Sequence, residues 1–203
     1  RSALRKNQMA GSSATAMTAS PQLVEIASYA PSLLVARAGL PSPLIAPEAQ
    51  ALHAAVMFAD VSGFTRLPES LAEAALGSSK ARVDGAEQLT RIINRYFQRM
   101  IDVIRRHGGD VVKFAGDAML VLFPVAGAGE GDLDGACALA AKCALELTKA
   151  STGGVHKVDE DGVSAVLRMH CAIGCGSYFL YRVGDRDRWE SVIAGEPLQQ
   201  ITV

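Results

Sequence analysis

Runs of apolar and polar residues divide the middle of the chain into short strands and a long helix. The segment AAVMFADV starts at Ala54 and is a continuous apolar run that ends near Asp60, as expected for a strand covered on both faces. Residues 83–107 carry apolar side chains at helical spacing and stop at a pair of glycines. DVVKFA and AMLVLF follow as two strands separated only by Gly116 and Asp117, which predicts a tight hairpin with Asp117 at its tip.

A second helix and further strands are predicted in the C-terminal part of the chain. Residues 134–150 are amphipathic, and LRMHCAIGCG, SYFLYRVG and WESVIAG predict three more strands. The order is βαββαβ with appended strands, which is the arrangement of a ferredoxin-like α+β fold. In that topology the third strand lies between the first two. Asp117 is therefore expected beside Asp60 at one edge of the sheet.

The N-terminal part differs in composition from this core. Residues 1–20 are rich in Ser, Ala and Thr and predict a flexible arm. Residues 21–50 predict a short helix that stops at Pro31, followed by a proline-rich linker. Residues 51–203 are then expected to form one domain.

Charge and hydropathy narrow the possible partners. The chain has 20 Lys and Arg residues against 21 Asp and Glu residues, so its charge gives no reason to expect nucleic acid or an anionic membrane as partner. The apolar runs are far shorter than the roughly 20 residues of a membrane-spanning helix, and the start lacks a signal-peptide pattern. A soluble, cytoplasmic protein without a membrane span is the expectation.

The four cysteines do not form a metal-binding pattern. They include no CxxC pair and no His at chelating spacing. Cys171 and Cys175, four residues apart in a strand, would be about 13 Å apart and could not share a metal or a disulfide. All four are expected to be reduced thiols in the core.

Two carboxylates at one sheet edge make a plausible site for a divalent metal and phosphate. Asp60 and Asp117 offer hard oxygen ligands suited to Mg²⁺, and the loop VSGFT can expose backbone N–H groups to phosphate oxygens. On residue types alone, such a pair can equally serve as caps, turns or surface ion pairs.

The segments MFADVSGFT and GGDVVKFAGDAMLVLF together resemble the paired signature of class III adenylyl and guanylyl cyclases. The similarity is greatest to the first catalytic domain of bicarbonate-responsive soluble adenylyl cyclases. GAEQLTRIINRYF is similar to the first long helix of that family, and the resemblance runs in register from about Ala54 to about Gln200. Two motifs in the correct order and at the correct distance make the resemblance specific.

The resemblance implies a reaction and the residues that perform it. Asp60 and Asp117, with the backbone carbonyl of Val61, would hold two Mg²⁺ or Mn²⁺ ions, and ATP would be converted to 3′,5′-cyclic AMP and pyrophosphate. Arg186 lies near where the family often has a basic residue that meets the triphosphate, although it can equally be a solvated turn charge. The loop residues implied to bind the triphosphate are Ser62, Gly63, Phe64 and Thr65.

The sequence departs from the family pattern after Gly195. Family members that supply the transition-state groups have Asn four residues and Arg eight residues after this Gly, but this chain has Gln199 and Val203. A valine cannot stabilise charge on the α-phosphoryl group. The resemblance therefore implies the metal-binding half of a site that lies between two domains, inactive without a second cyclase domain in the same or another chain. The family's domain also continues further, so residues 51–203 are expected to be a catalytic domain truncated at its C-terminal end.

The positions that recognise the base in this family are matched only in part. Lys113 matches a purine-contacting lysine of the family, but the usual polar companion is replaced by Val192, which implies a degenerate pocket. In soluble-type cyclases this pocket takes the activator bicarbonate through the lysine and an arginine, and that arginine position is Thr202 here. Lys113 could still attract an anion, or it could be an ordinary ion-pair partner.

Other readings of the sequence stay open. A catalytically silent cyclase-like module for nucleotide binding or scaffolding is compatible with the missing Asn and Arg. A diguanylate cyclase relative would need a GGDEF-like hairpin, whereas the tip here reads FAGDA. An RNA-binding sheet would need exposed aromatics on its middle strands, whereas Phe114 and Phe123 fit core positions better. ATP rather than GTP as the substrate follows from the resemblance alone.

Overall fold

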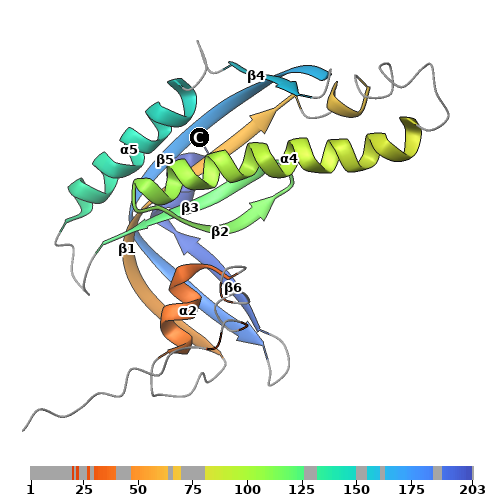
Figure 1. Cartoon of the computed structure of the whole chain (residues 1–203). Coiled ribbons are helices and arrows are strands. Elements are labelled where there is room, and N and C mark those ends of the chain that lie inside the picture. Colours follow the sequence, from red (N-terminus) through yellow and green to blue (C-terminus); the bar gives the residue numbers. More distant parts are fainter. Residues whose placement is uncertain are drawn as a thin grey trace, which may run out of the picture.

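The structure is a computed structural model that describes most of the predicted core (Figure 1). Its described residues are 20, 22, 27, 30–39, 47–63, 66–69, 81–125, 132–149, 155–160, 163–184 and 189–202. Its main elements are α2 (Ser32–Ala38), β1 (Glu48–Ser62), α4 (Ala81–Arg106), β2 (Asp110–Ala115), β3 (Ala118–Pro124), α5 (Leu133–Lys149), β4 (Val155–Glu160), β5 (Val163–Gly184), β6 (Trp189–Gly195) and α6 (Glu196–Ile201). The predicted flexible arm lies almost wholly outside the described residues.

The sheet has the predicted topology. In the described part of the chain six strands form one sheet with the order β2-β3-β1-β5-β4, and β6 pairs with β5. β3 is antiparallel to both β1 and β2, so β1 and β2 run parallel with β3 between them. The α+β fold class and the βαββαβ order are confirmed.

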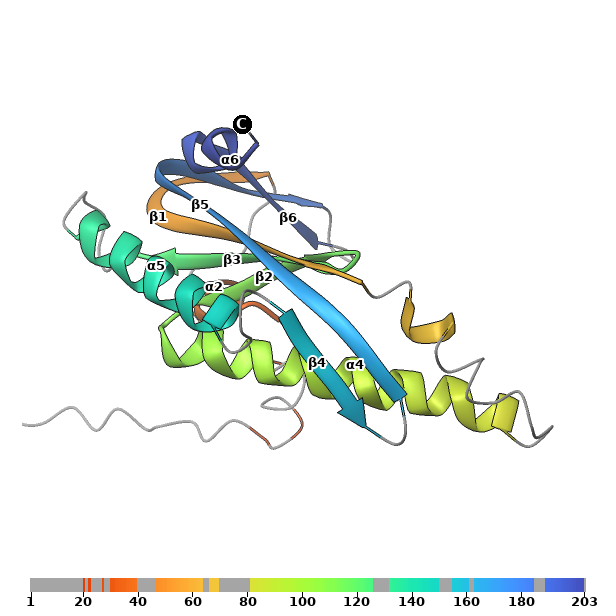
Figure 2. The ribbon, with the colours of Figure 1, turned by 90° about the horizontal axis from the view of Figure 1, so that it is seen from above.

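Helices cover both faces of the sheet. α4 and α5 lie on one face, where they enclose a core that includes Met57 of β1. α2 and α6 contribute to a second core around Val56 and Leu180, and Figure 2 shows α6 on the opposite side of the sheet from α4 and α5. Alternate residues of a strand point to opposite faces. Asp60, four residues from Val56, therefore belongs to the face that carries α2 and α6.

The local patterns predicted the two long helices and the hairpin closely. α4 and α5 each begin and end within two residues of the expected bounds, and β2 and β3 flank a turn at Gly116 and Asp117 as predicted. Across the described residues, no helix is both long and apolar enough to cross a membrane.

The expected start of the first strand is wrong. β1 begins at Glu48, six residues before Ala54, and these added residues pair with β5. Their exposed or half-buried side chains break the apolar run that was used to place the strand. β1 is longer than its apolar run because its first residues pair with a neighbouring strand. Hydropathy along the chain does not indicate this pairing.

The division of residues 167–184 into two strands is also wrong. They belong to the single 22-residue strand β5, and β4, which was not expected, pairs with its first part. The glycines that suggested a break serve close packing instead. A Cβ at Gly174 would overlap the backbone oxygen of Pro197, and a Cβ at Gly176 would lie 2.6 Å from Glu196 Oε2, so both glycines make room for α6.

The helix expected to stop at Pro31 lies mostly outside the described residues, although Gln22 and Ala27 are described and are helical. A further helix, α2, starts after Pro31. Pro31 is the N-cap of α2 with φ −54°, and a proline fits there because the first turn needs no N–H from it. The helix start is completed by a distant side chain, since the Asp110 carboxylate accepts bonds from Ser32 Oγ at 3.0 Å and from Leu33 N at 3.1 Å.

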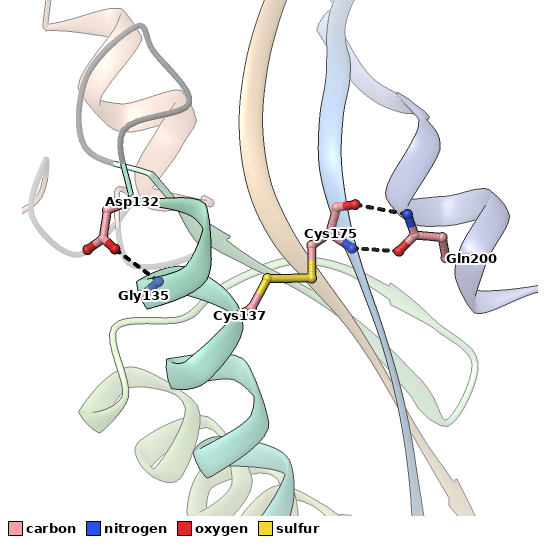
Figure 3. The surroundings of a disulfide bond; sticks show 5 residues. All are labelled: Asp132, Gly135, Cys137, Cys175 and Gln200. Carbon is pink, nitrogen blue, oxygen red and sulfur yellow. Dashed lines mark hydrogen bonds between the residues drawn. A yellow bond between two sulfur atoms is a disulfide. The ribbon is translucent and has the colours of Figure 1, made fainter.

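Two expectations about buried side chains need correction. Cys137 of α5 and Cys175 of β5 are joined by a disulfide in the structure, whereas all four cysteines were expected to be reduced (Figure 3). The two residues are 38 positions apart, so spacing along the chain could not reveal that they meet. Phe123 is buried as expected, but Phe114 is 50 % exposed and packs edge-to-face on Phe97 with ring centroids 5.6 Å apart. β2 is the edge strand, which leaves Phe114 only partly covered.

Candidate active site

The strand register places Asp117 beside Asp60. Asp60 near the end of β1 pairs with Ala118, the first residue of β3, and Asp117 is the residue before Ala118. A cross-strand pair plus one residue of chain separates the two aspartate Cα atoms by at most about 9 Å. Their side chains also stay accessible, since Asp60 is half-buried and Asp117 is exposed.

Neither aspartate is used by the fold as an ion-pair or hydrogen-bond partner. Within the described residues, no side-chain hydrogen bond or ion pair involves Asp60 or Asp117. The same part of the chain holds no group of three or more His, Cys, Asp and Glu residues arranged for a metal. The donor set is therefore two free carboxylates and the nearby backbone carbonyl of Val61. This set fits Mg²⁺, which binds one or two carboxylates and keeps water and phosphate ligands.

The loop after β1 is fixed by a glycine. Gly63 has φ +105°, and a Cβ there would lie 2.6 Å from the backbone oxygen of Val166 on β5. Its carbonyl accepts a bond from Arg66 N at 3.2 Å, so the chain turns sharply directly after Ser62. Phe64 and Thr65, the other expected phosphate-binding residues, lie outside the described residues, as does Arg186.

Two basic residues that sequence reasoning missed lie beside the aspartates. His170 of β5 pairs directly with Asp60, and Arg168 pairs with Ser62. Both are exposed, and cross-strand partners lie on the same face of the sheet with Cβ atoms about 5 Å apart. The alternation in LRMHC could have placed Arg168 and His170 on one face. Only the register with β1 shows that this face is the one that carries Asp60.

The structure places Lys113 against β6. Lys113 Nζ lies 3.7 Å from Glu190 Oε1, and both side chains are 60 % exposed. Val192, two residues after Glu190, points to the same side of β6 and is itself exposed. An exposed ion pair of this kind contributes little to stability, typically less than about 1 kcal/mol. Thr202 lies elsewhere, at the end of α6, with its hydroxyl 3.0 Å from the backbone oxygen of Gln199.

The region that departs from the expected pattern forms the short helix α6. Gly195 ends β6, and α6 starts with the next residue. Gln199 is exposed on this helix, whereas Val203 lies outside the described residues. An exposed amide is therefore present at the position expected for Asn.

Comparison with known sequences identifies the class of protein to which this domain belongs. Residues 47–189 match the family described as the adenylate and guanylate cyclase catalytic domain. The chain therefore belongs to this family, the class III cyclases, as its two motifs predicted.

Curated relatives include adenylate cyclase type 10 from two mammals. The Mus musculus protein is 28 % identical over 179 residues, and the Homo sapiens protein is 28 % identical over 180 residues. Each match covers 88 % of this chain but only 10 % of the relative. The chain thus spans about a tenth of the length of these curated relatives.

Solved structures share the fold. A bacterial light-regulated adenylyl cyclase matches with a TM-score of 0.58 and 17 % identity over 89 % of this chain and 46 % of that chain. The adenylyl cyclase CyaB from P. aeruginosa matches with a TM-score of 0.51 and 22 % identity over 76 % of this chain and 71 % of that chain. At these identities the similarity establishes the fold.

Proposed function

We propose that this domain is the metal-binding half of an adenylate cyclase that converts ATP to 3′,5′-cyclic AMP and pyrophosphate. The observation that carries the proposal is the register that brings Asp117 beside Asp60 while leaving both carboxylates without a partner in the described part of the chain. The similarity to adenylate cyclase type 10 favours ATP over GTP.

Each side chain at this sheet edge has a role in the proposed reaction. Asp60, Asp117 and the carbonyl of Val61 would hold two Mg²⁺ or Mn²⁺ ions, which when bound supply Lewis-acid activation of the 3′-hydroxyl and charge neutralisation at the leaving pyrophosphate. The turn at Ser62 and Gly63 would direct backbone N–H groups to the triphosphate. Arg168 and His170, on the same face, would add hydrogen-bond donors to the phosphate oxygens. Phe64, Thr65 and Arg186 are proposed to join them.

A second cyclase domain is needed because this half lacks a cation for the α-phosphoryl group. The positions expected for Asn and Arg are Gln199 and Val203. The proposed surface for such a domain is on β5 and β6, where an aromatic and aliphatic strip is exposed on one face. The strip consists of Phe179, Tyr181, Val183 and Val192, which are 38–47 % exposed. Apolar clusters of this kind commonly mark protein interfaces.

A silent nucleotide-binding or scaffolding module is the second candidate, favoured by the same Gln199 and Val203. It would bind the nucleotide without turnover, even with its natural second domain. The free carboxylates argue for catalysis, since a scaffold has no need of a metal pair. Lys113 is the proposed anchor if bicarbonate acts as activator, and a cytoplasmic location would supply both ATP and this anion.

The deciding experiment is a cyclase assay on the full-length protein that contains this domain, with Mg²⁺ or Mn²⁺ and with ATP or GTP. We expect cyclic AMP from the parent and none above background from Asp60→Asn, from Asp117→Asn or from residues 1–203 alone. Asp102→Asn is a matched control, because Asp102 is an exposed carboxylate on α4 that only accepts a bond from Gln98. Turnover that survives in both aspartate variants would refute the enzyme assignment. ATP binding without turnover in the parent would support the silent module.

A further inference from the structure

All four cysteines of the chain lie where α5 packs on β5. Cys137 and Cys143 are on α5, Cys171 and Cys175 are on β5, and all four belong to the core between these elements. The helix and the strand bring them together as two facing pairs. Cys137 and Cys175 are bonded with their Cα atoms 6.6 Å apart, a separation within the range of protein disulfides.

The second pair, Cys143 and Cys171, stays as thiols. Burial, with a further contribution from the neighbouring Cys171, raises the pKa of Cys143 to about 12. Burial also raises the pKa of Cys171 to about 11. Because the thiolate is the reactive form, these two cysteines are poor nucleophiles at neutral pH. Chemistry at this contact is therefore expected at Cys137 and Cys175, which lie within bonding distance of each other and are half-buried.

Cys175 is also held from the other face of the sheet. Its backbone N–H donates to Gln200 Oε1 at 2.9 Å, and its carbonyl accepts from Gln200 Nε2 at 2.9 Å (Figure 3). Gln200 belongs to α6, which packs closely over Gly174 through Pro197. Cys175 of β5 is thus linked to α5 through its own sulfur and to α6 through its own backbone.

We propose that Cys137 and Cys175 form a reversible disulfide that fixes this three-layer contact and thereby controls how firmly α6 is held on the sheet. The oxidant is a small-molecule disulfide such as oxidised glutathione. One cysteine thiolate attacks a glutathione sulfur, breaks its S–S bond and releases one glutathione thiolate. The second cysteine then attacks the mixed disulfide and releases the other. The protein loses two protons and two electrons, and two glutathione thiols are formed.

The consequence concerns the face that carries the active-site aspartates. α6 lies on the same face as Asp60, and its register on β5 is set by Gly174 and by Gln200 bonded to Cys175. Loss of the disulfide removes the covalent link between α5 and this strand at the residue that Gln200 binds. The hydrogen bonds of α6 to β5 are then expected to open more often. This inference does not rest on the proposed catalysis, since the cross-link and its effect on α6 exist without turnover.

The test uses the protein over residues 1–203 in glutathione buffers of increasing oxidised fraction, with alkylation and mass spectrometry to locate free thiols. We expect Cys137 and Cys175 to become protected together and Cys143 to stay reduced, with complete reversal by millimolar reduced glutathione. A loop of this length predicts that oxidation raises the Tm by roughly 10 °C. Amide exchange at α6 and at Cys175 should be at least about fivefold slower in the oxidised protein, with no change in α4.

Three variants separate the proposal from a general loss of stability. Cys137→Ser, in the first turns of α5, should abolish both the Tm shift and the redox dependence of exchange at α6, whereas Cys143→Ser should keep both. Gln200→Ala should keep the disulfide and the Tm shift but lose the redox dependence at α6. Three outcomes would each overturn the proposal. Cys137 and Cys175 could be alkylated in every buffer, or reduced glutathione could fail to reduce their disulfide in the native protein. Amide exchange in α6 could also be unchanged by oxidation. If Cys137→Ser fails to fold, the wild-type and Gln200→Ala comparison still decides it.

Discussion

The two ends of the β1–β5 strand pair carry similar charged residues but use them differently. At one end Glu48 faces Arg182, which is only 3 % exposed and donates to Glu48 Oε2 at 2.8 Å. Arg182 also donates to Gln50 at 3.1 Å, and Arg37 of α2 donates a hydrogen bond to the Glu48 carboxylate. At the other end Asp60 faces His170 with no hydrogen bond or ion pair in the described residues.

The difference separates charges that the fold uses from charges that are proposed to bind a ligand. At the Glu48 end Arg182 and Arg37 both pair with the Glu48 carboxylate, so these contacts link α2 to the sheet, while Arg182 Nε stays buried without a partner in the described residues. At the Asp60 end Asp60 is half-buried and His170 is exposed, and neither has a side-chain partner in the described residues, which leaves them available to a ligand. Both ends are cross-strand pairs of the same two strands, and they differ in the burial of Arg182 and in the contact of Glu48 with Arg37 of α2.

The largest expected effect is a loss of activity, without a loss of stability, when Asp60 is substituted. Asp60→Asn in the full-length protein should lower kcat/KM at least about 10³-fold, because a metal ligand is lost. The unfolding free energy of the domain should change by less than about 0.5 kcal/mol, as for other surface substitutions. A cyclase assay and urea denaturation of the same variant measure both. A large loss of stability would show that Asp60 belongs to the fold, and the contrast between the ends would fail.

The second-largest expected effect is a loss of stability when Glu48 is substituted. Glu48→Leu leaves the Arg182 guanidinium buried without its carboxylate and should destabilise the domain by about 3 kcal/mol in urea denaturation. The double variant Glu48→Leu with Arg182→Met removes both charges and should recover most of that loss. Arg168→Met, at the exposed end of the same strand, is the matched control with an expected change below about 0.5 kcal/mol. Equal losses for Arg168→Met and Glu48→Leu would contradict the distinction.

A smaller effect is expected where α2 is attached. Asp110→Ala removes the acceptor for Ser32 Oγ and Leu33 N and should cost about 1 kcal/mol, as for the loss of an N-cap. The loss should be measurable by denaturation, with faster amide exchange in α2. Asp110→Asn should retain part of the capping and show a smaller loss, since its carbonyl can still accept one bond. An unchanged exchange rate in α2 would mean that its apolar contacts alone hold it.

The smallest effect is expected at a half-buried pair between His107, which follows α4, and Glu146 of α5. The bond from His107 to Glu146, with Arg106 nearby, lowers the pKa of Glu146 below its ordinary value. A lowered folded-state pKa means that the pair stabilises the fold above the ordinary glutamate range and loses this contribution as pH falls through the lowered value. In His107→Ala the pKa of Glu146 should move up toward its ordinary value in an NMR titration, with Glu87 unchanged. No movement would assign the shift to Arg106 alone.

The comparison also explains what could be predicted at the two ends. Asp60 and Asp117 were predicted to meet because each stands at the end of a strong local pattern in a βαββαβ order, and the register of β1 with β3 confirms that they are neighbours. Their role in a metal site stays a prediction. His170 and Arg168 were missed because their importance depends on their register with β1. The pairing of Arg182 with Glu48 was missed because it depends on the register of β5 with β1 and on burial, and neither can be read from the local sequence pattern.

The sequence by itself determined the helices, the hairpin, the two aspartates and the family, since these follow from periodicity, turn residues and motifs that are local in the chain. Only the tertiary structure decided that β5 is one continuous strand, that Cys137 meets Cys175 and which charges are buried. These features depend on contacts between residues far apart in sequence, where glycines make room for a helix and a strand register selects each partner. Such contacts cannot be predicted from the local pattern of residues alone.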